Sequence, residues 1–302
     1  MNSIKENLKP RGHMGKTVVF DSEMDHNCFL KDFLSPSYME ENFNSWSTKQ
    51  RFDILSIKLR DSLVDEIIKK NIVDKEDFKR NNCKLELTHL YLSEHKKNLD
   101  ETEQNEISID FYDISSDLKN EYYKFLEESV SKLFNEPIYY QNVPTFRFHF
   151  PNQKGYEWED RYHTDVMLGH PPYELNLWLP FTKVYDSNSM RLTSLEDSLN
   201  FIKTSNYNFE SFASGVQYDK NMIQDLRRKS QPLNMNYGEF IIFDPRCLHC
   251  TQYNSTNETR ISMDVRIITE SNLQKYSREY RTTGRKKMLF QPGHYFSKQP
   301  IL

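Results

Sequence analysis

Two segments far apart in the chain carry residues with the types and spacing of a metal site. His163 and Asp165 are separated by one residue, so on an extended strand both would point to one side and Thr164 to the other. His249 follows the apolar run 240–243 and supplies a third candidate ligand. Two imidazoles and one carboxylate on one side of Fe(II) leave positions open for a co-substrate and O2. The sequence therefore predicts an Fe(II) site at these three residues.

The tripeptide His163-Thr164-Asp165 has little value by itself. With 9 His and 44 Asp+Glu in 302 residues, about 1.3 such tripeptides are expected by chance, and one is present. The segment after His249 is more informative, because it continues with Thr251, Asn254, Arg260 and Ser262.

This spacing resembles the phytanoyl-CoA hydroxylase-like branch of the Fe(II)/2-oxoglutarate oxygenases, in which a hydroxyl residue, Asn and Arg follow the distal His ligand at the same distances. Segments 169–180 and 188–190 are also similar to oxygenases encoded with carbohydrate-assembly and aminoglycoside-type clusters. The resemblance covers roughly residues 138–270. It implies Fe(II) and 2-oxoglutarate as cofactor and co-substrate, with O2 as the oxidant. The implied reaction is hydroxylation of a small molecule such as a sugar or nucleotide sugar, with succinate and CO2 as co-products.

The resemblance also implies a role for the residues after His249. The far carboxylate of 2-oxoglutarate needs a cationic partner, and a guanidinium forms paired hydrogen bonds with a carboxylate better than an ammonium does. Arg260 is expected to fill this role, with Ser262 and Thr251 as hydroxyl donors. Arg266 is the alternative because it shares a strand face with Arg260.

Two alternating segments predict a substrate-facing wall. Segment 144–150 places Arg147 and His149 on one face and three phenylalanines on the other, and segment 174–181 places Asn176 and Trp178 together. These four residues are expected to meet substrate, although ordinary structural positions in a β wall explain the pattern equally well. His170 lies in a turn and is expected beside the site rather than among the ligands.

Other functions remain open from the sequence. Cys247, His249 and Cys250 could contribute to a zinc site, but no second Cys-x-x-Cys completes it and alternation directs Cys250 away from His249. A cupin-like barrel that binds a metal or a sugar without turnover would carry similar residues. A metal-dependent isomerase or hydrolase could use the same ligands and would not need Arg260.

Composition limits the partners. The net charge is −4 with a pI near 6.2, so no overall basic field favours nucleic acid or an anionic membrane. The N-terminus has no signal-peptide core and no run of about 18 apolar residues occurs, which predicts a cytoplasmic chain with no membrane partner. Four cysteines are too few for a disulfide framework. The oligomeric state stays open, a homodimer included.

Short strands with Gly and Pro turns, together with a helical front, predict a mainly β fold with flanking helices, specifically a double-stranded β-helix or jelly-roll barrel of the cupin type. We expect one domain over 1–302. Its parts are an N-terminal arm (1–35), a mainly helical front portion (36–137), a barrel core (138–270) with an insertion or lid (185–232), and a basic tail (271–302).

Several local elements can also be predicted. Segment 117–134 should be a helix capped by Asp117 and ended by Pro137. Segments 195–202 and 219–229 should be helices in the insertion, joined by an aromatic stretch. Strands are expected at 17–20, 85–92, 107–114, 144–150, 163–165, 174–181 and 260–268.

Overall fold

The structure is a computed structural model that describes residues 17–20, 22–96, 104–152, 160–276, 282–283 and 290–302. The largest sheet of this described part contains β2 (Ser47–Arg51), β3 (Ile138–Tyr140), β4 (Thr145–His149), β5 (Leu175–Pro180), β8 (Glu239–Phe243) and β10 (Arg260–Thr269). All its pairs are antiparallel, in the order β2-β8-β5-β10-β3, with β4 also paired to β10. The antiparallel sheet, together with the helices around it, is consistent with the predicted mainly β fold with flanking helices.

Strand β10 is the centre of this sheet and matches the predicted strand 260–268. One of its edges pairs with β4 near Arg260 and with β3 near Ile267, while the other edge pairs with β5. Ile261, Met263 and Val265 are fully buried in the main hydrophobic core. Because strand side chains alternate, the intervening polar residues project from the opposite face of the sheet.

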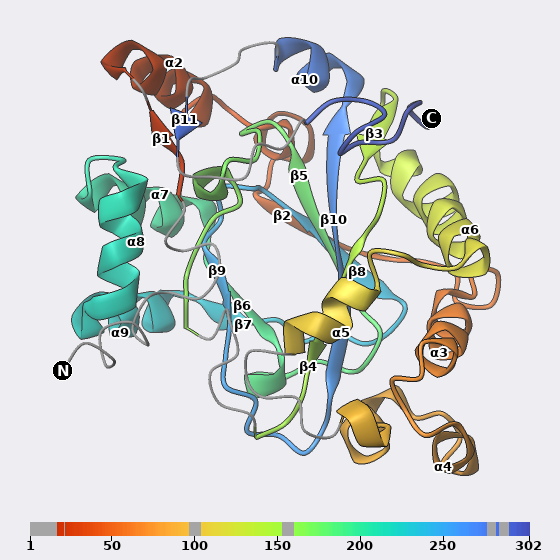
Figure 1. Cartoon of the computed structure of the whole chain (residues 1–302). Coiled ribbons are helices and arrows are strands. Elements are labelled where there is room, and N and C mark those ends of the chain that lie inside the picture. The colour runs from red at the N-terminus through yellow and green to blue at the C-terminus, as the bar shows by residue number, and fades with distance from the viewer. Residues whose placement is uncertain (1–16, 21, 97–103, 153–159, 277–281, 284–289) are drawn as a thin grey trace.

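A smaller sheet faces that polar side of β10 (Figure 1). It contains β6 (Met190–Leu192), β7 (Gln231–Pro232) and β9 (His249–Thr251) in the order β7-β6-β9. Two of its strands lie at the ends of the predicted insertion 185–232, so that segment contributes strands as well as helices. A further two-stranded pair joins β1 (Val19–Phe20) to β11 (Thr282–Thr283).

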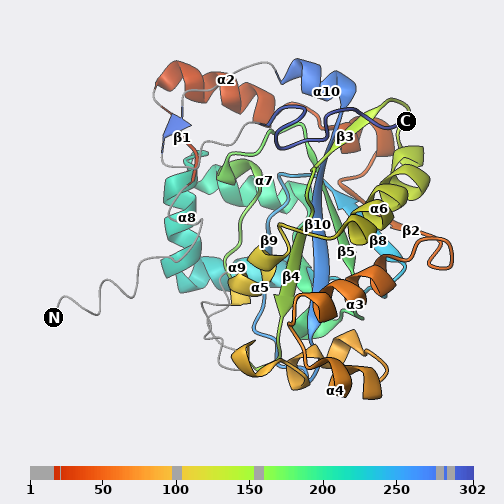
Figure 2. The ribbon, with the colours of Figure 1, turned by 45° about the vertical axis from the view of Figure 1, so that its right-hand side comes forward.

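Helices cover the strands on both sides (Figures 1 and 2). One side carries α3 (Leu59–Lys69), α5 (Gln104–Asp110) and α6 (Ser116–Phe125), which contribute buried residues to the main core. The other side carries α7 (Leu195–Thr204), α8 (Phe209–Tyr218) and α9 (Lys220–Lys229). The remaining α-helices of the described residues are α2 (Glu23–Phe33), α4 (Lys75–Arg80) and α10 (Glu270–Lys275).

Two predicted strands of the front portion are wrong. Segment 85–92 contains the 3₁₀ helix Leu85–Leu90, in which the Thr88 hydroxyl donates to the Leu85 carbonyl at 2.7 Å. Residues 107–110 form the end of α5, and residues 111–114 follow it. Ile107 and Phe111 are buried, while Ile109 is 57% exposed. A strand would place all three on one face, whereas a helix places only residues four apart together. The apolar spacing in this segment is therefore helical.

The front portion also contains strand β2, which the sequence analysis did not predict. Strand β2 pairs only with β8, at the edge of the sheet, so its sequence Ser-Thr-Lys-Gln-Arg lacks apolar alternation. The predicted helix 117–134 is confirmed as α6, followed by π and 3₁₀ turns to Leu133. Its cap is Ser115, whose side chain accepts from the Leu118 N–H, and not Asp117. Ser115 precedes the first helical residue, as a capping side chain must.

The aromatic stretch of the insertion begins a third helix there, α8, which was not predicted. Phe209 and Phe212 are buried in a second core with Phe29 and Phe33 of α2. These aromatics anchor helices to one another, and α2 replaces part of the predicted arm 1–35. Residues 1–16 of the predicted arm, residues 153–159, and Arg278, Arg281, Arg285, Lys286 and Lys287 of the predicted basic tail lie outside the described residues. No helix within the described ranges is long and apolar enough to cross a membrane.

Arg246 connects the segment before β9 to residues 33–40 through hydrogen bonds and an ion pair. Its guanidinium donates to both carboxylate oxygens of Asp244 at 2.8 Å and to the carbonyls of Phe33 and Ser35. Glu40 also pairs with it. Arg246 is 2% exposed, so these bonds replace the water that the cation loses on folding.

We expect Arg246→Lys to lower the free energy of unfolding by about 2 kcal/mol, because a lysine cannot reproduce the fork of hydrogen bonds to Asp244. Urea denaturation measures the change. Arg51→Lys is the control, since Arg51 is 82% exposed and bonds only at the surface. Equal losses for the two variants would contradict a special role of Arg246.

Candidate metal centre and its pocket

The three predicted ligands converge in the structure. One ligand atom from each of His163, Asp165 and His249 lies within 4.8 Å of the others, and all three side chains are buried. The two histidine segments pair directly, since His163 N–H donates to His249 O at 3.1 Å and His249 N–H donates to His163 O at 3.0 Å. Their rings lie 4.4 Å apart. This isolated β-bridge joins the segment of His163 to strand β9 and places the two histidines side by side.

The local conformation at the first two ligands differs from the predicted strand. His163 forms an isolated bridge, while Asp165 has φ −65 and ψ −32 and begins the 3₁₀ turn Val166–Leu168. The Thr164 hydroxyl accepts from the Met167 N–H at 3.1 Å and supports this turn. Strand alternation is therefore the wrong reason for the proximity of His163 and Asp165. The bridge followed by a turn directs both side chains to one place.

Both imidazoles are held in the form that a metal needs. Nδ1 of His163 donates to the Arg161 carbonyl at 2.8 Å, and Nδ1 of His249 donates to the Cys247 carbonyl at 3.1 Å. In this tautomer the lone pair of each ring that can bind a metal is on Nε2. Burial lowers the pKa of both histidines, and the neighbouring His249 lowers that of His163 further. The rings are therefore neutral at pH 7, as ligands must be.

Asp165 is held in its charged form by Arg266. Nε and Nη2 of Arg266 lie 2.9 and 2.8 Å from the same oxygen, Oδ2. Burial raises the pKa of Asp165, but Arg266, His170 and the two ligand histidines outweigh it and hold the pKa well below its usual value. Arg266, the sequence alternative to Arg260 as a co-substrate partner, is thus already engaged by a carboxylate.

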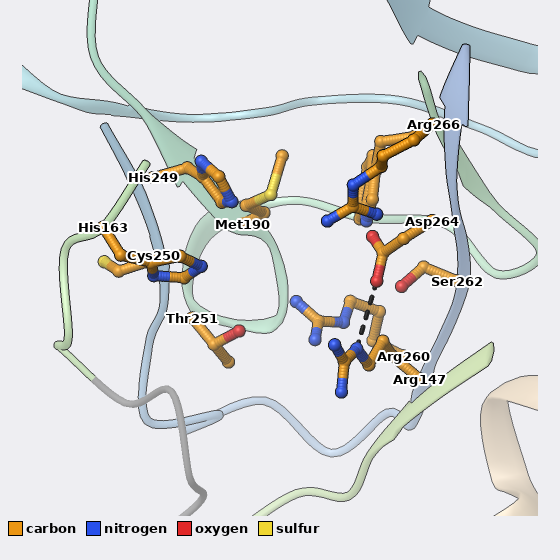
Figure 3. Close-up of a pocket in the computed structure, with 11 residues that line it drawn as sticks. Arg147, His163, Met190, His249, Cys250, Thr251, Arg260, Ser262, Asp264 and Arg266 are labelled. Atoms are coloured by element: carbon orange, nitrogen blue, oxygen red, sulfur yellow. Dashed lines mark hydrogen bonds and ion pairs between the residues drawn. The ribbon is translucent and has the colours of Figure 1, made fainter. Parts of the chain in front are cut away.

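An open cavity extends from the two histidines to the polar face of β10 (Figure 3), and its space, open solvent included, is about 430 Å³. On one side lie His163, His249, Thr251 and Met190, and facing them are the alternating side chains of β10 with Arg147. Arg147 Nε is 3.1 Å from Oδ2 of Asp264. The complete lining is Arg147, His163, Trp178, Met190, His249, Cys250, Thr251, Arg260, Ser262, Asp264 and Arg266.

The predicted binding residues divide into two groups. Arg260, Ser262, Thr251, Arg147 and Trp178 all line the cavity. His149 and Asn176 are buried but are absent from its lining. His149 lies opposite Arg260 in the β4–β10 register, and burial followed by the charge of Arg260 lowers its pKa well below the usual value. Asn176 lies opposite Arg266 on β5.

Three residues that line the cavity were not predicted to bind substrate or co-substrate. Asp264 was placed on the correct face by strand alternation, and Met190 belongs to β6 of the unpredicted small sheet. Cys250 lines the cavity, although alternation directed it away, and Cys247 packs in a separate apolar cluster. Burial raises the pKa of Cys250 to about 12 and that of Cys247 well above its usual value, so both thiols stay protonated. Neither cysteine joins the ligand group found among the described residues.

Asn254 explains part of the spacing between His249 and Arg260. Its amide donates to the Glu258 carbonyl at 2.9 Å and to the His149 carbonyl at 3.3 Å. Its carbonyl oxygen accepts from the hydroxyl of Thr256 at 2.6 Å. These bonds close the turn before β10 and attach it to β4, which sets where Arg260 enters the sheet.

His170 lies beside the centre, in a buried pair with Glu174 at 2.7 Å from Nδ1 to Oε1. Its ring packs 4.9 Å from Phe290 and 5.6 Å from Tyr295. Its backbone N–H donates to the Asp165 carbonyl at 3.2 Å. His170 therefore supports the turn that carries Asp165 and is not one of the converging ligands.

Part of the chain is similar in sequence to a known protein. No family model matches the chain. The streptomycin biosynthesis protein StrG of Streptomyces griseus is 25% identical over 162 residues. The match spans 53% of this chain and 60% of StrG, which is less than two thirds of that protein's length.

Comparison with solved structures gives distant matches. The non-haem monooxygenase ThoJ in its nickel complex has a TM-score of 0.37 and 10% identity, covering 76% of this chain and 77% of its own. The non-haem α-ketoglutarate-dependent carbocyclase SnoK from nogalamycin biosynthesis has a TM-score of 0.41 and 9% identity, covering 92% and 98%. Both structural likenesses are therefore distant.

Proposed function

We propose that the chain is a non-haem Fe(II)/2-oxoglutarate-dependent oxygenase of a small molecule, built as one domain on a double-stranded β-helix. The observation that carries the proposal is the buried convergence of His163, Asp165 and His249, whose two histidines line the same cavity as Arg260. The donor set fits Fe(II), because two neutral imidazoles and one carboxylate form a facial triad with open positions. A closed structural zinc site would use a fourth protein ligand.

Each part of the chain has a task in this proposal. Bound Fe(II) would supply the redox chemistry that couples O2 and 2-oxoglutarate to oxidation of a substrate C–H bond, with succinate and CO2 as co-products. Arg260 would bind the far carboxylate of 2-oxoglutarate, with Ser262 and Thr251 as hydroxyl donors. Trp178 and Met190 would exclude water from the cavity, and Arg147 would meet substrate. His149 and Asn176 would support this wall from behind.

One sequence relative supports the proposed substrate class. The likeness to a streptomycin biosynthesis protein favours a sugar, nucleotide sugar or similar biosynthetic intermediate as substrate. The likeness covers 53% of this chain, so the substrate class is a proposal for the whole protein. The phytanoyl-CoA hydroxylase-like branch is part of the same proposal, supported by the spacing from His249 to Arg260.

Calorimetry tests the proposal directly. Under anaerobic conditions we expect 2-oxoglutarate to bind the Fe(II)-loaded protein and to show no measurable binding to metal-free protein, because the metal supplies part of its site. Exposure to O2 should then consume 2-oxoglutarate and release succinate. A barrel that only binds a metal or sugar, or a metal-dependent isomerase or hydrolase, would bind metal without 2-oxoglutarate-dependent O2 consumption.

A further inference from the structure

Arg266 contacts Asp165 in a way that distinguishes the two carboxylate oxygens. Both Nε (2.9 Å) and Nη2 (2.8 Å) of the guanidinium lie against Oδ2. The side chains of Arg266 and Asp165 are 13% and 3% exposed, so water does not compete strongly for these bonds. The guanidinium thus occupies Oδ2 and leaves Oδ1 as the oxygen available to another partner.

The surrounding structure fixes both members of this pair. Arg266 lies in the interior of β10, opposite Asn176 of β5, and its carbonyl accepts from the Gln141 N–H at 2.8 Å. Asp165 begins a 3₁₀ turn that His170 supports through a backbone hydrogen bond. Asp264 and Glu174 act on Arg266 with additional negative charge. Neither side chain can turn away without leaving a buried charge unpaired.

The choice of oxygen decides how Asp165 can bind a metal. A carboxylate can bind a metal through one oxygen or through both, and binding through both takes an additional coordination position. An oxygenase site of this type needs its open positions for the co-substrate and O2. A carboxylate whose second oxygen is already bonded to a guanidinium is restricted to one metal contact.

We propose that Arg266 is a positioning residue that holds Asp165 as a one-oxygen metal ligand and so keeps a coordination position open. The inference rests on the proposed function. It also assigns the two arginines of β10 different tasks, with Arg260 directed to the co-substrate and Arg266 to a metal ligand.

Metal titration of Arg266→Gln and Arg266→Lys tests the inference without any turnover. Co(II) is titrated into the purified full chain, followed by calorimetry and by its visible absorption. We expect Arg266→Gln to weaken metal binding by about 10- to 100-fold, as is typical when a partner of a metal ligand is lost. The cobalt spectrum should change because Asp165 can bind through both oxygens. Arg266→Lys should recover part of the affinity, since one ammonium bond to Oδ2 remains.

Arg191→Gln is the matched control. Arg191 lies next to β9 and has several hydrogen bonds, to Ser230, Gln252 and Arg227, but none to a ligand residue. We expect it to leave metal affinity and the cobalt spectrum unchanged. Folded Arg266→Gln with wild-type affinity and spectrum would overturn the inference, as would equal losses in Arg191→Gln. If Arg266→Gln does not fold, Arg266→Lys alone decides, and a metal affinity equal to that of the wild type then counts against the inference, because a single ammonium bond holds Oδ2 less firmly than the guanidinium does. Failure of the wild-type chain to bind any divalent metal would instead reject the proposed function.

Discussion

Replacing His163 with alanine is expected to abolish 2-oxoglutarate-dependent succinate formation. His163 Nε2 is one of two imidazole donors in the candidate centre, and its Nδ1 bond to the Arg161 carbonyl fixes the ring in place. Loss of a partner behind a ligand typically reduces metal affinity or activity by about 10- to 100-fold, so loss of the ligand itself should lower succinate formation by at least ~1,000-fold. Succinate is measured with Fe(II), 2-oxoglutarate and O2 present.

The control for this variant is His294→Ala, which removes an imidazole from an exposed position. It should retain wild-type turnover. We expect the His163 variant to fold, because the backbone hydrogen bonds to His249 do not use the side chain. Circular dichroism verifies that it does. A folded His163→Ala chain that forms succinate at the wild-type rate would reject the assigned ligand set.

Arg260→Ala is expected to weaken 2-oxoglutarate binding while metal binding remains. Arg260 is 2% exposed and lines the cavity together with Ser262. Removing one partner of a buried charge pair costs about 2–5 kcal/mol, which corresponds to an increase in KM for 2-oxoglutarate of roughly 30- to 3,000-fold. Steady-state kinetics measure KM, and cobalt titration measures the retained metal affinity.

This variant separates the candidate reaction classes. An isomerase or hydrolase that uses the same three ligands has no need of the arginine, so its turnover would be indifferent to Arg260→Ala. Arg191→Ala controls for the general effect of removing a well-bonded arginine, and we expect its KM for 2-oxoglutarate to stay near the wild-type value. A KM within about twofold of wild type in Arg260→Ala would exclude Arg260 as the carboxylate partner, because a lost charge pair changes affinity by far more.

The two arginines of β10 should therefore be distinguishable by experiment. Arg260→Ala is expected to affect the co-substrate, and Arg266→Gln is expected to affect the metal. Both residues lie on the polar face of one strand, which the alternation in 260–268 predicted. The alternation did not indicate which arginine meets which partner, because Asp165 approaches Arg266 from a different part of the chain.

Apolar and polar alternation in the sequence predicted some strands correctly and failed for others. Alternation over 144–150, 174–181 and 260–268 predicted β4, β5 and β10, because successive side chains of a strand point to opposite faces, here an apolar face and a face that carries polar residues. It was unreliable in segment 107–114, where a short apolar run fits either a helix or a strand. It also missed β2, since an edge strand with one neighbour need not be apolar.

By itself, the sequence determined the chemical types of the site: two histidines, one carboxylate, and an arginine eleven residues after the second histidine. It also determined the polar face of β10, because side-chain direction in a strand follows from position along the chain. Only the tertiary structure decided that His163 pairs with His249 across a backbone bridge, that Asp165 begins a turn, and that Arg266 occupies one of its oxygens. These contacts join segments far apart in sequence, and their geometry depends on how the sheets and helices pack against one another.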